Sequence, residues 1–316
     1  MNASFLCVGA NPAIDKRARC AQFRLHGVNR LVDVAAEPGG KAAHVAMALR
    51  ALGEQPVWLG FAGGGSGREL LAGLDALGIK TQVVETQQPT RTNLEVLDDA
   101  GMATEILEPG GHISSEELDH FRSSCHQAFA QMTGGYVLVS GSLPPGAPSD
   151  LYGELVRSAR LAGCRTFVDT SGEALKSALE QKPDFVKPNR EEGESLTGEA
   201  IADMPAARKT LSEFLARGAR SVALSLGKEG LLWCSVENEH VVYAHHPTVE
   251  ARSSVGSGDA TVAGFASALA RKFEPEATAR WAAACGAANC LASSPGRIKL
   301  ADVQRMAKAV RVETIR

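Results

Sequence analysis

The consecutive residues Gly256, Ser257, Gly258 and Asp259 carry the clearest chemical signal in the sequence. The glycines allow a tight turn with exposed N–H groups, and the apolar segment 260–270 that follows is typical of a buried helix. Free amides at a helix N-terminus bind anions such as phosphate. A carboxylate there does not help to bind an anion, so we expect Asp259 to accept a hydroxyl proton while the amides hold a phosphoryl group in transfer. An aspartate that only caps the helix is the alternative.

Short apolar runs alternate with longer helical patterns along most of the chain. The expected strands are Phe5–Val8, Val57–Phe61, Tyr136–Val139, Thr166–Val168, Phe185–Val186, Val222–Leu226 and Leu231–Trp233. The expected helices are Ala42–Leu52, Arg68–Leu77, Glu116–Met132, Leu151–Ala162, Ala174–Glu180, Pro205–Ala216, Ala260–Arg271, Ala277–Leu291 and Ala301–Val310. Apolar strands separated by helices indicate an α/β fold with a mostly parallel sheet covered on both faces.

Several of the expected strands end in a cluster of polar residues or glycines. The clusters are Asn11–Pro12, Gly63–Gly65, Ser140–Ser142, Asp169–Ser171, Lys187–Asn189 and Gly227. In open α/β sheets the ligand crevice lies beyond the carboxyl ends of the strands, so we expect these clusters to converge on one site.

Two stretches break the alternation of strands and helices. Residues 28–36 and residues 91–97 with 104–107 are β-prone, alternate polar with apolar side chains and contain turn signals. They fit a small extra sheet that covers the site, formed by about residues 16–38 and 89–108. No linker marks a second domain, so we expect a single domain over residues 1–316.

The bulk composition argues against several classes of partner. The formal net charge is −3 and aromatic residues make up 5% of the chain, which argues against nucleic-acid binding. No apolar run approaches the roughly 20 residues of a membrane helix, and the N-terminus lacks the pattern of a signal peptide. The seven cysteines are scattered without a CxxC pair, as is typical of reduced thiols. We therefore expect a cytoplasmic protein that binds neither nucleic acid nor a membrane.

The motifs of the chain follow one another in an informative order. They are Asn11–Asp15, Pro38–Lys41, Thr90–Asn93, Ser140–Pro144, Lys187–Glu192, Ser225–Gly227 and Gly256–Asp259. In this order they resemble the ribokinase-like (PfkB) sugar kinases over about residues 5 to 295. They look most like the phosphosugar branch, which includes 1-phosphofructokinase, the minor 6-phosphofructokinase and tagatose-6-phosphate kinase. Each motif alone is a weak signal, and the complete order is a strong one.

The resemblance implies a fold and an activity. The fold is a three-layer αβα sandwich with a small β-sheet lid, often used as a dimer interface, so we expect a homodimer through the lid. The activity is ATP- and Mg²⁺-dependent transfer of the γ-phosphoryl group to a primary sugar hydroxyl. The expected substrate is a sugar phosphate, either fructose 1-phosphate or another ketohexose phosphate.

The resemblance also implies roles for residues on the sugar side. Asp259 matches the catalytic base of the family, and Asp15 matches the carboxylate that accepts hydrogen bonds from sugar hydroxyls. Two further groups carry the remaining contacts. Gly39 and Gly40 allow the backbone to approach the substrate closely, and Lys41 and Arg91 are candidates for binding the phosphate that the substrate already carries, with surface charge as the alternative.

Residues of the nucleotide side follow later strands. Asn189 and Glu192 match the element that organises Mg²⁺ in the family, and the alternative is a helix start with acidic residues in its first turn. Lys187 is expected to contact the phosphate in transfer. The remaining candidates for the nucleotide pocket are Ser225, Gly227, Gly230, Ser254 and Asn289.

The sequence departs from the family pattern in two places. After Gly39, Gly40 and Lys41 the family usually has glycine, a variable residue and asparagine, whereas this chain has Ala42, Ala43 and His44. The missing asparagine normally contacts the sugar, so His44 is either a replacement ligand or a buried, satisfied helix histidine. Ser257 stands where alanine is more usual, and its amide is unchanged.

Three other functions stay open at this stage. His44 leaves room for a kinase of the same fold that acts on an unphosphorylated sugar or a nucleoside. The chain is alternatively a non-catalytic sensor of sugar phosphates or nucleotides, although Asp259 and Glu192 argue against this. The glycine-rich loop 63–67 also suits an NAD-dependent dehydrogenase, but no acidic residue completes that fingerprint about 20 residues later.

Overall fold

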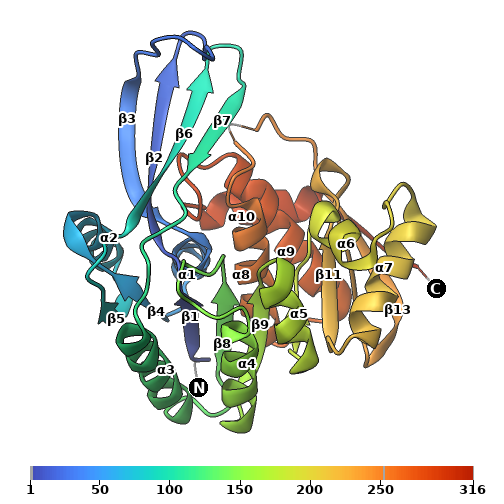
Figure 1. Ribbon diagram of the computed structural model, residues 1–316. Helices are drawn as coiled ribbons and strands as arrows, with labels where there is room; N and C mark the ends of the chain where they lie inside the picture. The colour runs from blue at the N-terminus through green and yellow to red at the C-terminus, as the bar shows by residue number, and fades with distance from the viewer. Residues whose placement is uncertain (1–2, 252, 316) are drawn as a thin grey trace.

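The protein forms two β-sheets, one large and one small, in a computed structural model that describes residues 3–251 and 253–315 (Figure 1). The strands of the large sheet are, in spatial order, β14 (Arg311–Ile315), β13 (Asn238–His245), β12 (Leu231–Ser235), β11 (Ser221–Ser225), β10 (Phe185–Val186), β9 (Arg165–Asp169), β8 (Tyr136–Ser140), β1 (Phe5–Gly9), β4 (Pro56–Ala62) and β5 (Lys80–Glu85). From β11 to β5 all neighbouring strands run parallel. The predicted α/β fold with a mostly parallel sheet is confirmed.

The far edge of the large sheet is antiparallel. The strand predicted at 231–233 is β12, and it pairs with β11 in antiparallel register, Ser225 opposite Leu231. Only a tight turn around the short 3₁₀ helix η1 (Gly227–Glu229) separates them, and so short a connection can join only antiparallel strands. β13 and β14 extend this edge. The sequence pattern missed both of them and β5 at the opposite edge. β5 and β14 lack a continuous apolar run, whereas the apolar run 241–244 of β13 was a usable signal.

Helices cover both faces of the large sheet. They are α1 (Lys41–Ala51), α2 (Gly64–Ala76), α3 (Ser115–Ala130), α4 (Leu151–Leu161), α5 (Gly172–Glu180), α6 (Arg190–Thr197), α7 (Met204–Ala216), α8 (Ser257–Ala270), α9 (Pro275–Cys290) and α10 (Leu300–Ala309). All of the predicted helices are present, and α6 is a helix that the pattern did not indicate.

The alternation of side chains along β1 shows how this packing arises. Phe5 and Cys7 point into the core that contains α1, α8 and α9, whereas Leu6 and Val8 point into the core that contains α3 and α4. Successive side chains of a strand face opposite sides, so a strand buried on both sides must be apolar throughout. This is why the central strands read as unbroken apolar runs.

The small sheet consists of β3 (Val32–Gly39), β2 (Ala13–Cys20), β6 (Arg91–Asp98) and β7 (Ala103–Leu107), in that order. It rises from one end of the large sheet (Figure 1). β2 follows β1 after only residues 10–12, and β3 leads through Gly40 directly into α1. The predicted extra sheet is therefore present, with its β3 strand beginning at Val32 rather than at residue 28.

No helix in the part of the chain that the structure describes is both long enough and apolar enough to cross a bilayer.

Candidate active site

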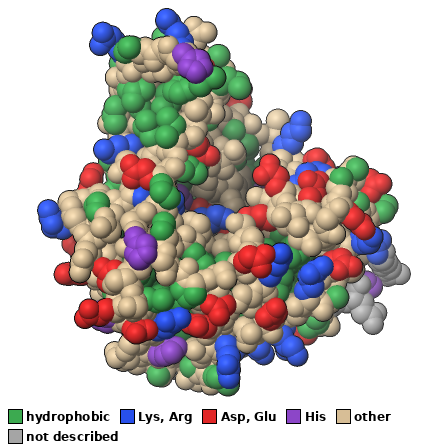
Figure 2. Space-filling view, viewed as in Figure 1, with side chains coloured by type: hydrophobic (Ala, Val, Ile, Leu, Met, Phe, Trp, Pro, Cys, Tyr) green, Lys and Arg blue, Asp and Glu red, His purple; other side chains and the backbone are tan. Residues whose placement is uncertain are grey.

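A cleft of about 1260 Å³ lies between the small sheet and the carboxyl ends of the central strands, and Figure 2 shows the surface hollowed there. It brings together predicted site residues that are far apart in the sequence. Those that line it are Asp15, Gly40, Lys41, His44, Arg91, Lys187, Asn189, Glu192, Ser225, Gly227, Ser254, Gly256, Ser257, Gly258 and Asp259. Gly39, Gly230 and Asn289 lie outside this lining.

The N-terminus of α8 opens into the cleft. Its cap residue is Gly256, whose φ of 79° lies in the left-handed region, and no side chain caps the helix. A Cβ at Gly256 would lie 2.6 Å from Cβ of Pro295, so a larger residue would not fit. Asp259 lies in the first turn and its side chain does not cap the helix, so the interpretation of Asp259 as a helix cap is wrong. The Ser257 amide, expected to hold the phosphoryl group, instead donates to the Ser254 carbonyl at 3.1 Å, so the amides that follow it in the first turn are the ones available to an anion.

The close approach of α8 and α9 fixes the position of this helix start. A Cβ on Gly264 would lie 2.8 Å from Cα of Ala282 and 3.0 Å from Sγ of Cys285, so only glycine allows the two helices to meet this closely. Asn289 of α9 donates to the Val255 carbonyl at 2.7 Å and accepts from the Gly296 amide at 2.9 Å. Asn289 thus supports the loop ahead of α8 from behind rather than lining the cleft.

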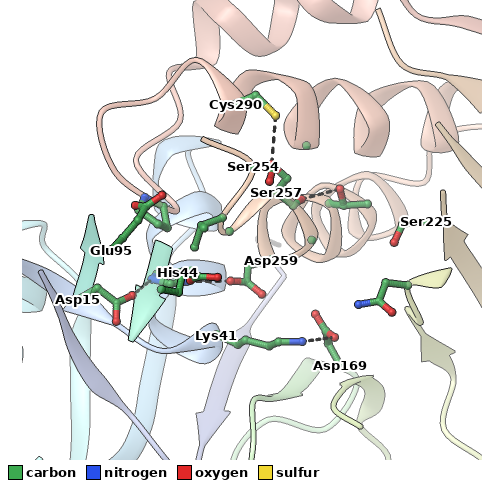
Figure 3. Close-up of a pocket in the computed structure, with 18 of the residues that line it drawn as sticks. Asp15, Lys41, His44, Glu95, Asp169, Ser225, Ser254, Ser257, Asp259 and Cys290 are labelled. Carbon is green, nitrogen blue, oxygen red and sulfur yellow. Dashed lines mark hydrogen bonds and ion pairs between the residues drawn. The ribbon is translucent and has the colours of Figure 1, made fainter. Parts of the chain in front are cut away.

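A chain of charged groups crosses the cleft from the small sheet to α8 (Figure 3). Nδ1 of His44 lies 2.8 Å from Oδ2 of Asp259, and Nε2 of the same ring lies 2.8 Å from Oδ2 of Asp15. His44 is 5% exposed, so the ring is shielded from water. Burial alone would lower the pKa of His44, but the two carboxylates raise it to about 10.

Asp15 reaches this position because Gly39 has no side chain. A Cβ on Gly39 would lie 2.3 Å from Cγ of Asp15. Asn93 of β6 donates to Oδ1 of Asp15 at 2.8 Å. Burial alone would raise the pKa of Asp15, but the hydrogen bonds from His44 and Asn93 bring it below its ordinary value. Gly39 therefore makes room for the Asp15 carboxylate and does not itself line the cleft.

A second charged cluster in the cleft consists of Lys41, Lys187, Asp169 and Glu192. Nζ of Lys41 lies 2.9 Å from Oδ1 of Asp169 and 3.9 Å from Glu192, and Nζ of Lys187 lies 3.7 Å from Oδ2 of Asp169. Burial alone would raise the pKa of Asp169, but the ammonium groups of Lys187 and Lys41 lower it. Burial alone would lower the pKa of Lys41, but the carboxylates of Asp169, Asp259 and Glu192 raise it. The Lys41 ammonium thus lies among acids, and not on the Arg91 side where a substrate phosphate was expected.

Asn189 and Glu192 form the start of α6. The Asn189 side chain accepts from the Glu192 amide at 2.7 Å, and the Glu192 carboxylate accepts from the Asn189 amide at 2.8 Å. This reciprocal capping box occupies one oxygen of Glu192 and leaves the other facing Lys41. The interpretation of Asn189 and Glu192 as a helix start is therefore confirmed, and the second oxygen of Glu192 still faces the cleft.

The oxygen atoms near Lys187 suit Mg²⁺, which keeps several waters and takes one or two carboxylates. Oδ2 of Asp169 is buried without a hydrogen-bond partner, and Oε1 of Glu192 is not used by the capping box. No group of three or more His, Cys, Asp or Glu side chains in the described residues could hold an ion by itself. The donor set therefore fits an ion that is held partly by phosphate oxygens and water.

Arg91 stands where β6 begins, at the mouth of the cleft. It donates to the carbonyls of Glu108 at 2.8 Å and Asn11 at 3.1 Å, while its buried Nε has no partner. Partial burial lowers the pKa of this guanidinium. An unpaired buried donor is costly, so a ligand oxygen at Nε would relieve that cost.

Two of the glycine candidates serve the fold. A Cβ on Gly230 would lie 2.1 Å from the Ala244 carbonyl oxygen, so this glycine allows the β11–β12 turn to pack on β13. The glycine loop 63–67 starts α2, and a Cβ on Gly63 would lie 2.1 Å from the Gln88 carbonyl oxygen. Residues 63–67 do not line the cleft, and this placement argues against the dehydrogenase alternative.

Sequence reasoning missed two groups of the cleft. Asp169 was noted only as part of a polar cluster at a strand end, although its position after the apolar strand β9 was a usable signal. The other group joins the small sheet to the loop ahead of α8. Glu95 of β6 accepts from Arg17 and from the Ser253 hydroxyl, both at 2.6 Å, and Arg17 also donates to the Ser293 carbonyl. Nothing in the local sequence pairs these distant residues.

The family model described as pfkB family carbohydrate kinase matches residues 3–300, which is nearly the whole chain. The chain belongs to this family. It is therefore a phosphotransferase of the carbohydrate kinase class, and family membership implies ATP as the phosphoryl donor.

Solved structures of other family members agree with this assignment. Phosphofructokinase-2 from Escherichia coli in complex with potassium is 29% identical, with a TM-score of 0.89 and coverage of 97% of this chain and 98% of that chain. The same Escherichia coli enzyme is also known in complex with fructose-6-phosphate and in a tetrameric inhibited form. A possible 1-phosphofructokinase from Thermotoga maritima is 25% identical, with a TM-score of 0.85 and coverage of 99% and 100% of the two chains. These likenesses confirm the ribokinase-like fold and the predicted relationship to phosphofructokinases.

The charged state of His44 makes the stability of this kinase depend on pH. Because folding raises the pKa of His44 from 6.5 to about 10, its contribution is complete below pH 6.5 and is lost as the pH rises to about 10. At about 1.4 kcal/mol per pKa unit, we expect the free energy of unfolding of the wild type to fall by on the order of 3–5 kcal/mol more than that of His44→Gln over this range. Urea unfolding at a series of pH values measures the difference, and parallel curves for the two proteins would contradict the assignment.

Proposed function

We propose that the protein phosphorylates a sugar phosphate, fructose 1-phosphate or another ketohexose phosphate, at a primary hydroxyl with ATP and Mg²⁺. The observation that carries the proposal is the position of the Asp259 carboxylate in the first turn of α8, beside amides that no side chain caps, at the floor of the cleft. A proton acceptor and a set of anion donors on one helical turn are the two requirements of phosphoryl transfer to an alcohol.

The chemical step follows from this arrangement. The acceptor hydroxyl gives its proton to Asp259, and its oxygen forms a bond to the γ-phosphorus. The bond from the γ-phosphorus to the bridging oxygen breaks, and its electron pair leaves with ADP. The amides at the start of α8 and the ammonium groups of Lys41 and Lys187 face the charge that spreads over the phosphoryl oxygens, in a cleft where water screens it less.

Magnesium, when bound, supplies charge neutralisation for the triphosphate. Glu192 and Asp169 are the side chains that would hold it, through their oxygens and through water. Lys41 and Lys187 keep Asp169 ionised by lying on either side of it, and the capping box keeps Glu192 in place. Ser225, Gly227 and Ser254 also line the cleft and suit contacts to the nucleotide.

The sugar lies on the other side of Asp259. Arg91, with its unpaired Nε, is the candidate for the phosphate that the substrate carries, and Asp15 is the candidate for the sugar hydroxyls, whereas both ring nitrogens of His44 already contact carboxylates. The relatives named as phosphofructokinases support a phosphorylated ketohexose over an unphosphorylated sugar or nucleoside. Lys41 is reassigned here from the substrate phosphate to the phosphoryl group in transfer, because its partners are Asp169 and Glu192.

The small sheet closes the sugar side as a lid and also supplies a surface for a second copy of the chain. Strand alternation directs Asp15, Glu95 and Glu105 toward the cleft, so the opposite face carries Val34 and Ile106. The exposed apolar side chains of the small sheet and its loops are Leu25, Val28, Leu31, Val32, Val34, Met102, Ile106 and Leu107, of which Leu107 lines the cleft. Figure 2 shows hydrophobic side chains gathered on this part of the molecule. So large an apolar surface is typical of an interface, and a homodimer through the lid would cover it.

Replacement of the proposed base tests the reaction directly. Asp259→Asn keeps the size of the side chain and removes the proton acceptor, so we expect kcat to fall by about a hundred- to ten-thousand-fold while ATP still binds. ADP release and nucleotide calorimetry measure the two effects. Asp75→Asn, on an exposed helix position, is the matched control and should behave as the wild type. Activity of Asp259→Asn near that of the control would remove Asp259 from the mechanism.

Replacement of Arg91 tests the phosphate site. Arg91→Ala should raise the KM for the sugar phosphate by about ten- to a hundredfold, because a charged hydrogen bond contributes about 1.5–3 kcal/mol. The KM for ATP should stay within about twofold. Arg208→Ala on the exposed side of α7 is the control. Equal increases in both KM values would place Arg91 outside the sugar-phosphate site.

Charges on the outer face of the lid test the dimer. The double substitution Val34→Asp and Ile106→Asp puts two carboxylates into the proposed interface, so the mass measured by light scattering should fall from dimer to monomer. Leu161→Asp, at an exposed apolar position of α4, is the control and should leave the mass unchanged. A wild type that is already monomeric at micromolar concentration would contradict the interface.

A further inference from the structure

We propose that His44 is a positively charged positioning residue that joins the Asp15 and Asp259 carboxylates and fixes the direction of Asp259. This inference rests on the proposed function of Asp259 as base, and it assigns to His44 a task different from contact with the sugar. The asparagine usual in related motifs has no charge and cannot perform it.

The two contacts of the ring favour two protons on it. Nδ1 and Nε2 of His44 each lie 2.8 Å from a carboxylate oxygen. A neutral imidazole has a single N–H, so it could donate to only one of the two carboxylates and would present a lone pair to the other. An imidazolium carries an N–H at both positions: Nδ1 donates to Asp259, and Nε2 forms an ion pair with Asp15 whose angle does not meet hydrogen-bond geometry. The geometry of the two contacts therefore favours the charged ring.

The surrounding charges agree with the charged ring. Asp15 comes from β2 and Asp259 from α8, and Glu105 of β7 adds a third negative charge. Lys41, on the same helix as His44, is a nearby cation that acts mainly on Asp169, Asp259 and Glu192, and Arg91 of β6 acts on Asp15. Burial disfavours the imidazolium, but the carboxylates outweigh it and hold the pKa of His44 well above its ordinary value.

The backbone holds the ring in one place. His44 lies in the first turn of α1, where its amide donates to the Gly40 carbonyl at 3.1 Å. Gly296 packs directly on it, since a Cβ at residue 296 would lie 2.7 Å from the His44 carbonyl oxygen. Ala42 and Ala43 beside it are small and buried. Three contacts thus hold His44 in place: α1 holds its backbone, Gly296 packs against its carbonyl group, and Asp15 and Asp259 contact its ring.

The contact with His44 sets the direction of the Asp259 carboxylate. His44 engages Oδ2 of Asp259, which leaves Oδ1 for the acceptor hydroxyl; Figure 3 shows one oxygen turned to the ring and the other turned away from it. A carboxylate held by one oxygen presents the other in a defined direction, and such orientation is worth large factors in rate. Because Asp15 belongs to the small sheet, the same ring also ties the direction of the base to the sugar-binding strand.

Nuclear magnetic resonance of the imidazole tests the charge without any assay of activity. With ¹⁵N-labelled histidine, the His44 signal is the one missing from His44→Gln. At about pH 8 we expect both ring nitrogens to be protonated, and we expect Asp15→Asn and Asp259→Asn each to lower the pKa of His44 by about one unit or more. Glu313→Gln, which removes the carboxylate partner of His245, is the control and should leave His44 unchanged. A singly protonated His44 at about pH 7.5, or a pKa that neither acid affects, would overturn the proposal.

Kinetics test the positioning role. In His44→Gln and His44→Asn, the second made in case the first does not fold, kcat should fall by about ten- to a hundredfold and the KM for ATP should change by less than about twofold. A purely structural role would instead lower the melting temperature and leave kcat of the folded fraction unchanged. Unchanged kcat in both variants would overturn the proposal.

The role of Asp259 as base and the charge of His44 can be contradicted independently of each other. If Asp259→Asn retains activity, the proposed function of the base fails, and the resonance experiment still decides whether His44 is charged. If Asp259→Asn is inactive and His44 is neutral, the proposed function stands and the inference about His44 falls.

Discussion

The active site of this kinase depends on a helix that starts without a side-chain cap. Most buried helix ends satisfy their free amides with a capping side chain or with water. α8 begins instead at a left-handed glycine, and Pro295, Asn289 and the glycine contact with α9 hold that start rigidly in place. The unsatisfied amides are therefore a fixed property of the fold, and a phosphoryl group is the kind of ligand that satisfies them.

Charge balance is the second constraint on the cleft. Lys187 and Asp169 are buried and Lys41 is partly exposed, and removing a buried member of such a pair typically costs about 3–5 kcal/mol because its partner is left uncompensated. The acids on the sugar side, Asp15 and Asp259, have a single imidazole between them. The cleft thus separates into a side with two ammonium groups, suited to the triphosphate, and a side with carboxylates, suited to hydroxyls.

Much of this architecture was predictable from the sequence, for reasons that lie in local patterns. The apolar run of β1 and the small-residue run of α8 are short-range signals, and the motif order placed the cleft at the carboxyl ends of the strands. The edge strand β14 and the helix α6 were missed because exposed or polar segments carry weak periodicity, and the apolar run 241–244 of the neighbouring strand β13 was not recognised. The ion pair between Lys41 and Asp169 could not be found in this way, since a separation of 128 residues leaves no local trace. The double contact of His44 depends on β2, α1 and α8 meeting at one point, which only the folded chain shows.

The contact of Ser253 with Glu95 has a mechanical consequence. Ser253 lies three residues before Gly256, the cap residue of α8. Glu95 belongs to the small sheet and accepts a hydrogen bond from Arg17. If that sheet swings outward to admit a sugar, the hydroxyl loses its acceptor and the segment leading into α8 loosens at the same moment. We expect the return of the sheet to restore this contact and to order the backbone ahead of α8 again. The position of the small sheet and the order of this helix start are thereby coupled through one hydroxyl group.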